Sequence, residues 1–122
     1  MKLRYLIPVL LFSTVHGAAL AQNYVLWSGG ITIDEREEAP TGGTKLVFFV
    51  QSGAFLSDVR VRVKDASGKE LVNVTTEGPW LILALPPGRY QVLAELPNGE
   101  SRSANIDVGT EPREFGFMFS EQ

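Results

Sequence analysis

The stretch Leu83-Ala84-Leu85-Pro86-Pro87-Gly88-Arg89-Tyr90-Gln91-Val92 decides the fold class of this chain. An apolar segment runs into two prolines and a glycine, and a second segment with apolar alternation begins at Tyr90. Because Pro86 and Pro87 have no backbone N–H to donate, strand pairing must stop there, and Gly88 supplies the backbone freedom that a reversal requires. The pattern is typical of the connection between two strands of an antiparallel β-sandwich.

From Lys45 onward, apolar segments of strand length are separated by turn signals. Residues 46–50 and 80–85 are apolar throughout, which indicates strands covered on both faces, whereas Val59, Val61 and Val63 alternate with basic residues as in a half-buried strand. We predict an all-β, seven-stranded antiparallel sandwich spanning residues 44–120. Its strands are expected at 46–50, 59–64, 70–76, 80–85, 90–96, 101–108 and 115–119. Trp80, at the start of its strand, is expected to close one end of the core.

The first 21 residues have the features of a signal peptide. Lys2 and Arg4 precede an uncharged apolar run, 5–15, and Ala19-Leu20-Ala21 matches the small-x-small cleavage pattern. We therefore expect cleavage between Ala21 and Gln22. The apolar run is too short to span a bilayer, which takes about 20 residues. The sequence predicts a periplasmic or secreted protein that is not inserted in the membrane after cleavage.

Residues 22–43 form the least regular part of the sequence, between the signal peptide and the sandwich. Tyr24-Val25-Leu26-Trp27 is compatible with a short strand or with a packing segment. Thr32 and Glu35 have the spacing of a helical capping box, so a short acidic helix of one or two turns is expected before the first core strand. Pro40 would end it.

The charge and the reactive residue types exclude several classes of function. Without Lys2 and Arg4 the chain has 9 basic and 14 acidic residues, which disfavours nucleic acid as a partner. It contains no cysteine, and its one histidine, His16, lies in the predicted signal peptide. Cysteine–histidine and serine–histidine catalysis and Cys/His zinc sites therefore need residues that the exported chain lacks. We predict a non-enzyme without a cofactor or a metal.

Three stretches carry a family resemblance. The segments 57–63, 65–69 and 78–90 resemble carboxypeptidase regulatory-like domains, which share a prealbumin-like (transthyretin-like, Ig-like) sandwich. Gly29-Gly30-Ile31 and the acidic run 34–37 are similar to the segment that precedes this domain in small exported proteobacterial proteins. The resemblance implies an accessory domain without peptidase activity of its own.

This resemblance covers roughly residues 29–96 and departs from the family pattern at Pro40-Thr41-Gly42-Gly43, where the acidic helix is cut short. Beyond residue 96 only the strand pattern agrees.

Tyr24 and Trp27 are the binding candidates, because their segment lies outside the regular strands; the alternative is that both pack onto the domain. We expect a monomer that acts as an accessory or protein-interaction module for an envelope or secreted partner. The alternative is a module for small ligands or carbohydrate that uses Trp27, Tyr24 or Trp80. A basic stripe, Arg60, Arg62 and Lys64, is interpreted as a solvated strand face rather than a site for an acidic ligand.

Overall fold

The computed structural model of the protein describes residues 24–122. The predicted signal peptide, 1–21, and its cleavage site between Ala21 and Gln22 lie outside the described residues. Across the part that is described, no helix has the length and apolar character needed to cross a membrane.

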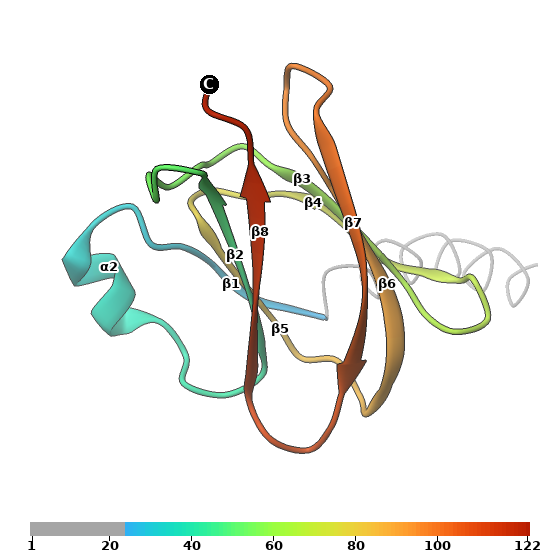
Figure 1. Ribbon diagram of the computed structural model, residues 1–122. Helices are drawn as coiled ribbons and strands as arrows, with labels where there is room; N and C mark the ends of the chain where they lie inside the picture. Colours follow the sequence, from blue (N-terminus) through green and yellow to red (C-terminus); the bar gives the residue numbers. More distant parts are fainter. Residues whose placement is uncertain (1–23) are drawn as a thin grey trace, which may run out of the picture.

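Two four-stranded sheets face each other across one apolar core (Figure 1). The first sheet has the order β1-β5-β2-β8 and the second has the order β4-β3-β6-β7. A short helix, α2 (Ile33–Glu38), lies beside the first sheet, away from the second (Figure 1). The strands of the first sheet are β1 (Val25–Gly29), β5 (Trp80–Leu83), β2 (Thr44–Val50) and β8 (Arg113–Phe119). Those of the second are β4 (Glu70–Thr75), β3 (Arg60–Lys64), β6 (Gly88–Glu95) and β7 (Ser101–Val108).

The all-β sandwich is confirmed, but the expectation of seven strands paired only in antiparallel fashion is wrong in two respects. The described residues form eight strands, because Val25–Gly29 pairs with β5 as an edge strand, so the sandwich begins well before residue 44. In addition, β2 and β8 are parallel, with Phe48 opposite Phe117. These two strands lie far apart in the sequence and become neighbours only when the whole sheet assembles. The turn signals between consecutive strands therefore could not predict their pairing.

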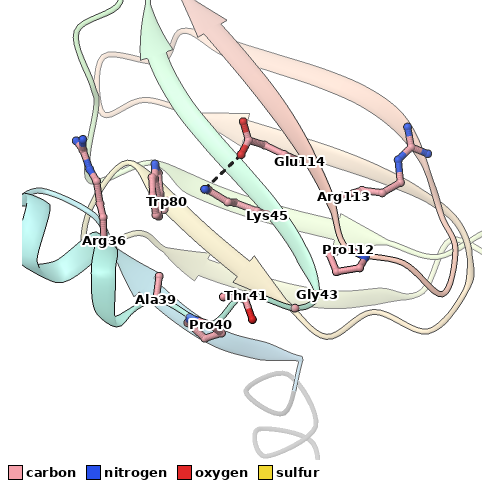
Figure 2. Close-up of a pocket in the computed structure, with 11 residues that line it drawn as sticks. Arg36, Ala39, Pro40, Thr41, Gly43, Lys45, Trp80, Pro112, Arg113 and Glu114 are labelled. Atoms are coloured by element: carbon pink, nitrogen blue, oxygen red, sulfur yellow. Dashed lines mark ion pairs between the residues drawn. The ribbon is translucent and has the colours of Figure 1, made fainter.

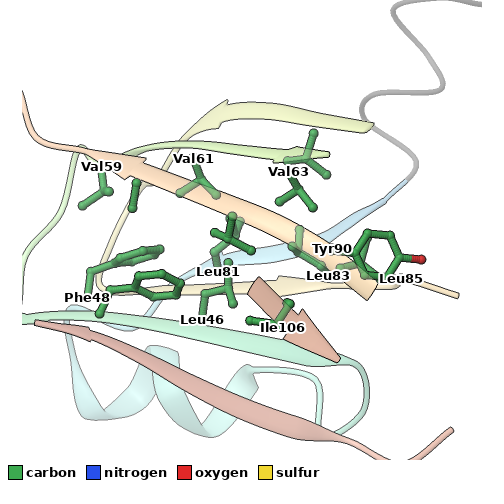
Figure 3. Close-up of a cluster of buried hydrophobic side chains, with 14 of the residues drawn as sticks. Leu46, Phe48, Val59, Val61, Val63, Leu81, Leu83, Leu85, Tyr90 and Ile106 are labelled. Atoms are coloured by element: carbon green, nitrogen blue, oxygen red, sulfur yellow. The ribbon is translucent and has the colours of Figure 1, made fainter. Parts of the chain in front are cut away.

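The core lies between the sheets and is built from the alternate positions of each strand. Leu46 and Phe48 of β2 and Leu81 and Leu83 of β5 are fully buried. The rings of Phe48 and Phe117 stack at 5.5 Å between centroids. Figure 3 shows these side chains meeting the valines of β3, which come from the opposite sheet. The valines with no exposed surface are Val59, Val61, Val63, Val72 and Val92.

The Pro-Pro-Gly stretch is the passage from the first sheet to the second. It joins the end of β5 at Leu83 to the start of β6 at Gly88. Tyr90 is buried at this corner and its hydroxyl donates a 2.6 Å hydrogen bond to the carbonyl oxygen of Pro86. The hydrogen bond ties the passage to the strand that follows it.

The expected acidic helix is confirmed as α2. The side chain of Thr32 accepts a hydrogen bond from the Glu35 N–H at 3.1 Å, and the Glu35 carboxylate accepts one from the Thr32 N–H at 3.0 Å. This reciprocal capping box satisfies two N–H groups at the start of the helix. None of the helical residues is buried, so α2 depends on its contacts with the first sheet rather than on the core.

Candidate binding face

Trp80 lies on the outer face of the first sheet, so the expectation that it closes the core is wrong. Leu81 and Leu83 point into the core, and strand alternation therefore turns Trp80 and Ile82 outward. The Trp80 side chain is half-buried and is not part of the core cluster. When every residue of a strand is apolar, the sequence does not show whether the odd-numbered or the even-numbered side chains face the core. This is why the sequence pattern placed Trp80 in the core.

Two cations and a second tryptophan surround Trp80. The Lys45 Nζ lies 3.4 Å from the centroid of the Trp80 ring, and the guanidinium of Arg36 lies 5.6 Å from it. Trp27 meets Trp80 edge to face at 6.4 Å. Glu114 of β8 is paired with Lys45 at 3.2 Å, and Figure 2 shows this pair beside Trp80. Cation–π contacts of this kind hold the lysine and the arginine flat against the sheet.

A second aromatic group continues the same face toward the ends of β2 and β8. Phe49 points outward from β2, and its ring lies against the backbone of Gly116 on β8. Phe55 forms an isolated bridge with Phe49 and lies under the guanidinium of Arg36 at 4.4 Å. Arg36 therefore links the two aromatic groups. We call the surface formed by Trp27, Phe49, Phe55, Trp80, Arg36 and Lys45 the aromatic face.

The aromatic face ends in an open hollow of about 400 Å³ between α2, the segment after it and the start of β8. Trp80 and Lys45 line its inner side, and Pro40 and Thr41 line the side toward α2 (Figure 2). The carboxylate of Glu114 is largely exposed, so the rim is charged while the floor is aromatic. Such a hollow is suited to a side chain or a sugar ring rather than to a buried cofactor.

The structure separates the two residues that the sequence singled out for binding. Trp27 belongs to the aromatic face, where it contacts Trp80. Tyr24 instead packs against the core cluster, and its carbonyl oxygen accepts a hydrogen bond from the N–H of Ala84. The sequence left open whether this segment binds a partner or packs onto the domain. Tyr24 packs onto the domain, whereas Trp27 contributes to a surface. Sequence reasoning missed Arg36, Lys45, Phe49 and Phe55. These residues come from α2, β2 and the loop after β2, and only the tertiary structure brings them together.

The exposed apolar residues gather in the same layer. Five large hydrophobic side chains of the described chain are exposed, by 48 to 71%, and all five belong to the first sheet, to α2, to the segment between β1 and α2 or to the loop after β2. They are Leu26, Ile31, Ile33, Phe55 and Met118. Scattered exposed hydrophobic residues are ordinary, but these five lie on one layer beside the rings of Trp27, Phe49 and Trp80, and together they form an apolar surface with no protein cover among residues 24–122.

The outer face of the second sheet is polar. Arg60 donates a hydrogen bond to the Asn73 side chain at 3.2 Å, and Arg89 pairs with Asp107 at 2.9 Å. Arg62 and Lys64 line a shallow hollow of about 210 Å³ with Gln91, Leu93 and Ser103. The basic stripe is therefore part of a mixed polar surface.

The titratable groups with shifted pKa values serve the framework rather than a reaction centre. Hydrogen bonds from the Ser67 hydroxyl and the Lys69 N–H lower the pKa of Asp65, which organises the turn between β3 and β4. A backbone N–H from Ser120 lowers the pKa of Glu100. Within the described part of the chain, no three acidic, histidine or cysteine side chains are grouped as metal ligands would be.

Comparisons with known proteins leave the sandwich and its aromatic face as the basis for assigning a function. No protein-family model matches the chain, and no curated protein matches it. The class that fold and surface define is a cysteine-free, mostly β sandwich with one polar and one apolar outer face.

Proposed function

We propose that this protein is an exported, non-catalytic interaction module of the carboxypeptidase regulatory-like type that binds another envelope or secreted protein through the aromatic face. The observation that carries the proposal is the asymmetry of the sandwich: within residues 24–122, the exposed large hydrophobic residues all lie in the layer of the first sheet. An apolar surface of this kind, next to a charged rim, has the composition of a protein-binding site. Arg36 and the tryptophans are of the residue types that dominate binding energy at interfaces.

Site-specific photocrosslinking in the native producing cells tests this proposal. A photoreactive phenylalanine analogue is placed at Met118, which is 52% exposed beside Phe49, and in a matched strain at Ser103, which is exposed on β7 of the second sheet. We expect a protein adduct from position 118 and none from position 103. Equal adducts from the two positions, or none from either in cells that export folded protein, would contradict the proposal.

The meeting of Trp27 and Trp80 favours carbohydrate binding as a second candidate function. Aromatic rings on an exposed sheet face provide apolar platforms for sugar rings, although Lys45 covers one side of Trp80 at 3.4 Å. Titration of the purified protein with soluble oligosaccharides, followed by tryptophan fluorescence, checks this function. A saturable change that Trp27→Ala removes would support it, and an unchanged spectrum across the panel would argue against it.

A further inference from the structure

The net charge of the described chain belongs to one layer of the sandwich. The first sheet with α2 and its loops, residues 24–56, 77–84 and 111–122, carries eight acidic and three basic side chains. The second sheet with its loops, residues 57–76 and 85–110, carries six of each. The layer with the aromatic face therefore has a net charge of −5 and the other layer has none.

The carboxylates of α2 are placed to act on a partner. Asp34, Glu37 and Glu38 are exposed, and none of them forms an ion pair with another of the described residues. Glu35 and Arg36, by contrast, turn toward the protein, in the capping box and over the aromatic rings. Ile33 is 71% exposed and shares the outward side of the helix with these three carboxylates. The helix thus presents negative charge and apolar surface together.

Charge decides between the possible occupants of this surface. A second copy of the chain would bring another layer of charge −5 against the first, and a membrane of anionic lipid would be repelled in the same way. A cationic surface would be attracted and steered to the site, while its apolar side chains would cover the exposed isoleucines and rings. We infer that the aromatic face with α2 docks a protein segment in which Lys or Arg residues are interspersed with apolar ones; this inference rests on the proposed function.

Two fluorescein-labelled peptides of 12 residues serve as probes, one alternating Lys with Leu and one alternating Glu with Leu. Binding to the purified protein is followed by fluorescence anisotropy at low and at physiological salt. The test variant is Asp34→Asn/Glu37→Gln/Glu38→Gln on α2. The matched control, Asp58→Asn/Glu70→Gln/Glu95→Gln, removes the same charge from exposed positions in the layer of the second sheet.

We expect the Lys–Leu peptide to bind and the Glu–Leu peptide not to bind. The α2 variant should lose about ten-fold in affinity, because it removes three exposed carboxylates that would each form an ion pair with the peptide, and exposed ion pairs are individually weak. The control should stay within about two-fold of the wild type. A second variant, Ile33→Ser/Phe55→Ser, should also weaken binding, but without changing its dependence on salt, because it removes apolar contact rather than charge.

Equal losses in the α2 variant and the control would reduce the binding to non-specific attraction by net charge and would overturn the inference. Binding of the Glu–Leu peptide, or concentration-dependent dimerisation through the same face in sedimentation experiments, would overturn it as well. The proposed function fails separately, by the absence of adducts from position 118. Adducts at position 118 to a partner whose contact segment is acidic would support the proposed function and refute the inference that the docked segment is basic.

Discussion

At the scale of single residues, Tyr90 shows how one hydroxyl secures the passage between the sheets. Its side chain is buried and donates to Pro86 O at 2.6 Å. We expect Tyr90→Phe to lower the free energy of unfolding by about 1 kcal/mol, because the hydrogen bond is lost while the ring remains packed. Chemical denaturation at pH 7 measures this loss. Tyr24→Phe is the matched control, and an equal loss there would show that the hydrogen bond at the passage is unimportant.

The same hydroxyl makes the free energy of unfolding depend on pH, in a direction that the structure defines. Burial raises the pKa of Tyr90 above its ordinary value of 10.0, so the folded state favours the neutral phenol. The stabilisation is complete below the pKa of the unfolded chain and is lost as pH rises through the folded value. The wild type should therefore approach the Tyr90→Phe variant in stability above about pH 10.

Gly78, in the turn before β5, has no room for a side chain because the backbone at the end of β1 lies against it. A Cβ atom built at Gly78 would lie 2.2 Å from the carbonyl oxygen of Gly29, which is backbone and cannot rotate away. We expect Gly78→Ala to destabilise the fold by about 1–3 kcal/mol, as overpacking does, and to loosen β1. Thermal unfolding and amide hydrogen exchange of β1 measure both effects. Gly109→Ala, where a Cβ meets nothing within 4 Å, should be close to neutral.

At the scale of elements, Glu100 holds the end of β8 to the turn between β6 and β7. Its carboxylate accepts hydrogen bonds from the Ser120 N–H at 2.9 Å and from Arg102 at 2.7 Å. The Ser120 N–H is the main cause of its lowered pKa. Because the folded pKa lies below the unfolded one, the stabilisation is complete above the ordinary value of 4.5 and is lost as pH falls through the folded pKa.

Comparison of the wild type with Glu100→Gln tests the linkage. The difference in their unfolding free energies should be greatest near neutral pH and should shrink as both are titrated below the ordinary carboxyl pKa. Urea denaturation over a pH series gives this difference. A gap that stays constant down to the acid limit would mean that the Glu100 charge does not hold β8.

At the scale of the whole molecule, the position of Trp80 outside the core leads to an inverted order of mutational effects. Leu81→Ala should cost about 2–5 kcal/mol, because it opens a cavity at a fully buried position. Trp80→Ala removes a larger side chain but leaves an open surface instead of a cavity, so it should cost less. Thermal and urea unfolding of the two variants decides the order. A greater loss in the free energy of unfolding for Trp80→Ala than for Leu81→Ala would indicate that Trp80 packs in the core.

The sequence predicts those features that depend on neighbours along the chain. The capping box of Thr32 and Glu35, the turn at Asp65 and the passage at Pro86 each involve residues within a few positions of one another, and all are found. The parallel pairing of β2 with β8 joins distant segments, so no local pattern carries it. The predicted strand 80–85 illustrates a second limit. Because its residues are all apolar, the sequence does not show which side chains face the core, and only packing against the second sheet buries Leu81 and Leu83 there.

By itself, the sequence determined that this chain forms a mostly β sandwich with a short capped helix, because alternation, turn chemistry and capping are local properties of the chain. Tertiary structure alone decided which outer face is polar and which is aromatic. Trp27, Arg36, Phe55 and Trp80 are spread over more than fifty positions and meet only because β1 and β5 pair and α2 lies against the first sheet. A binding surface made of such distant residues is a property of the closed sandwich.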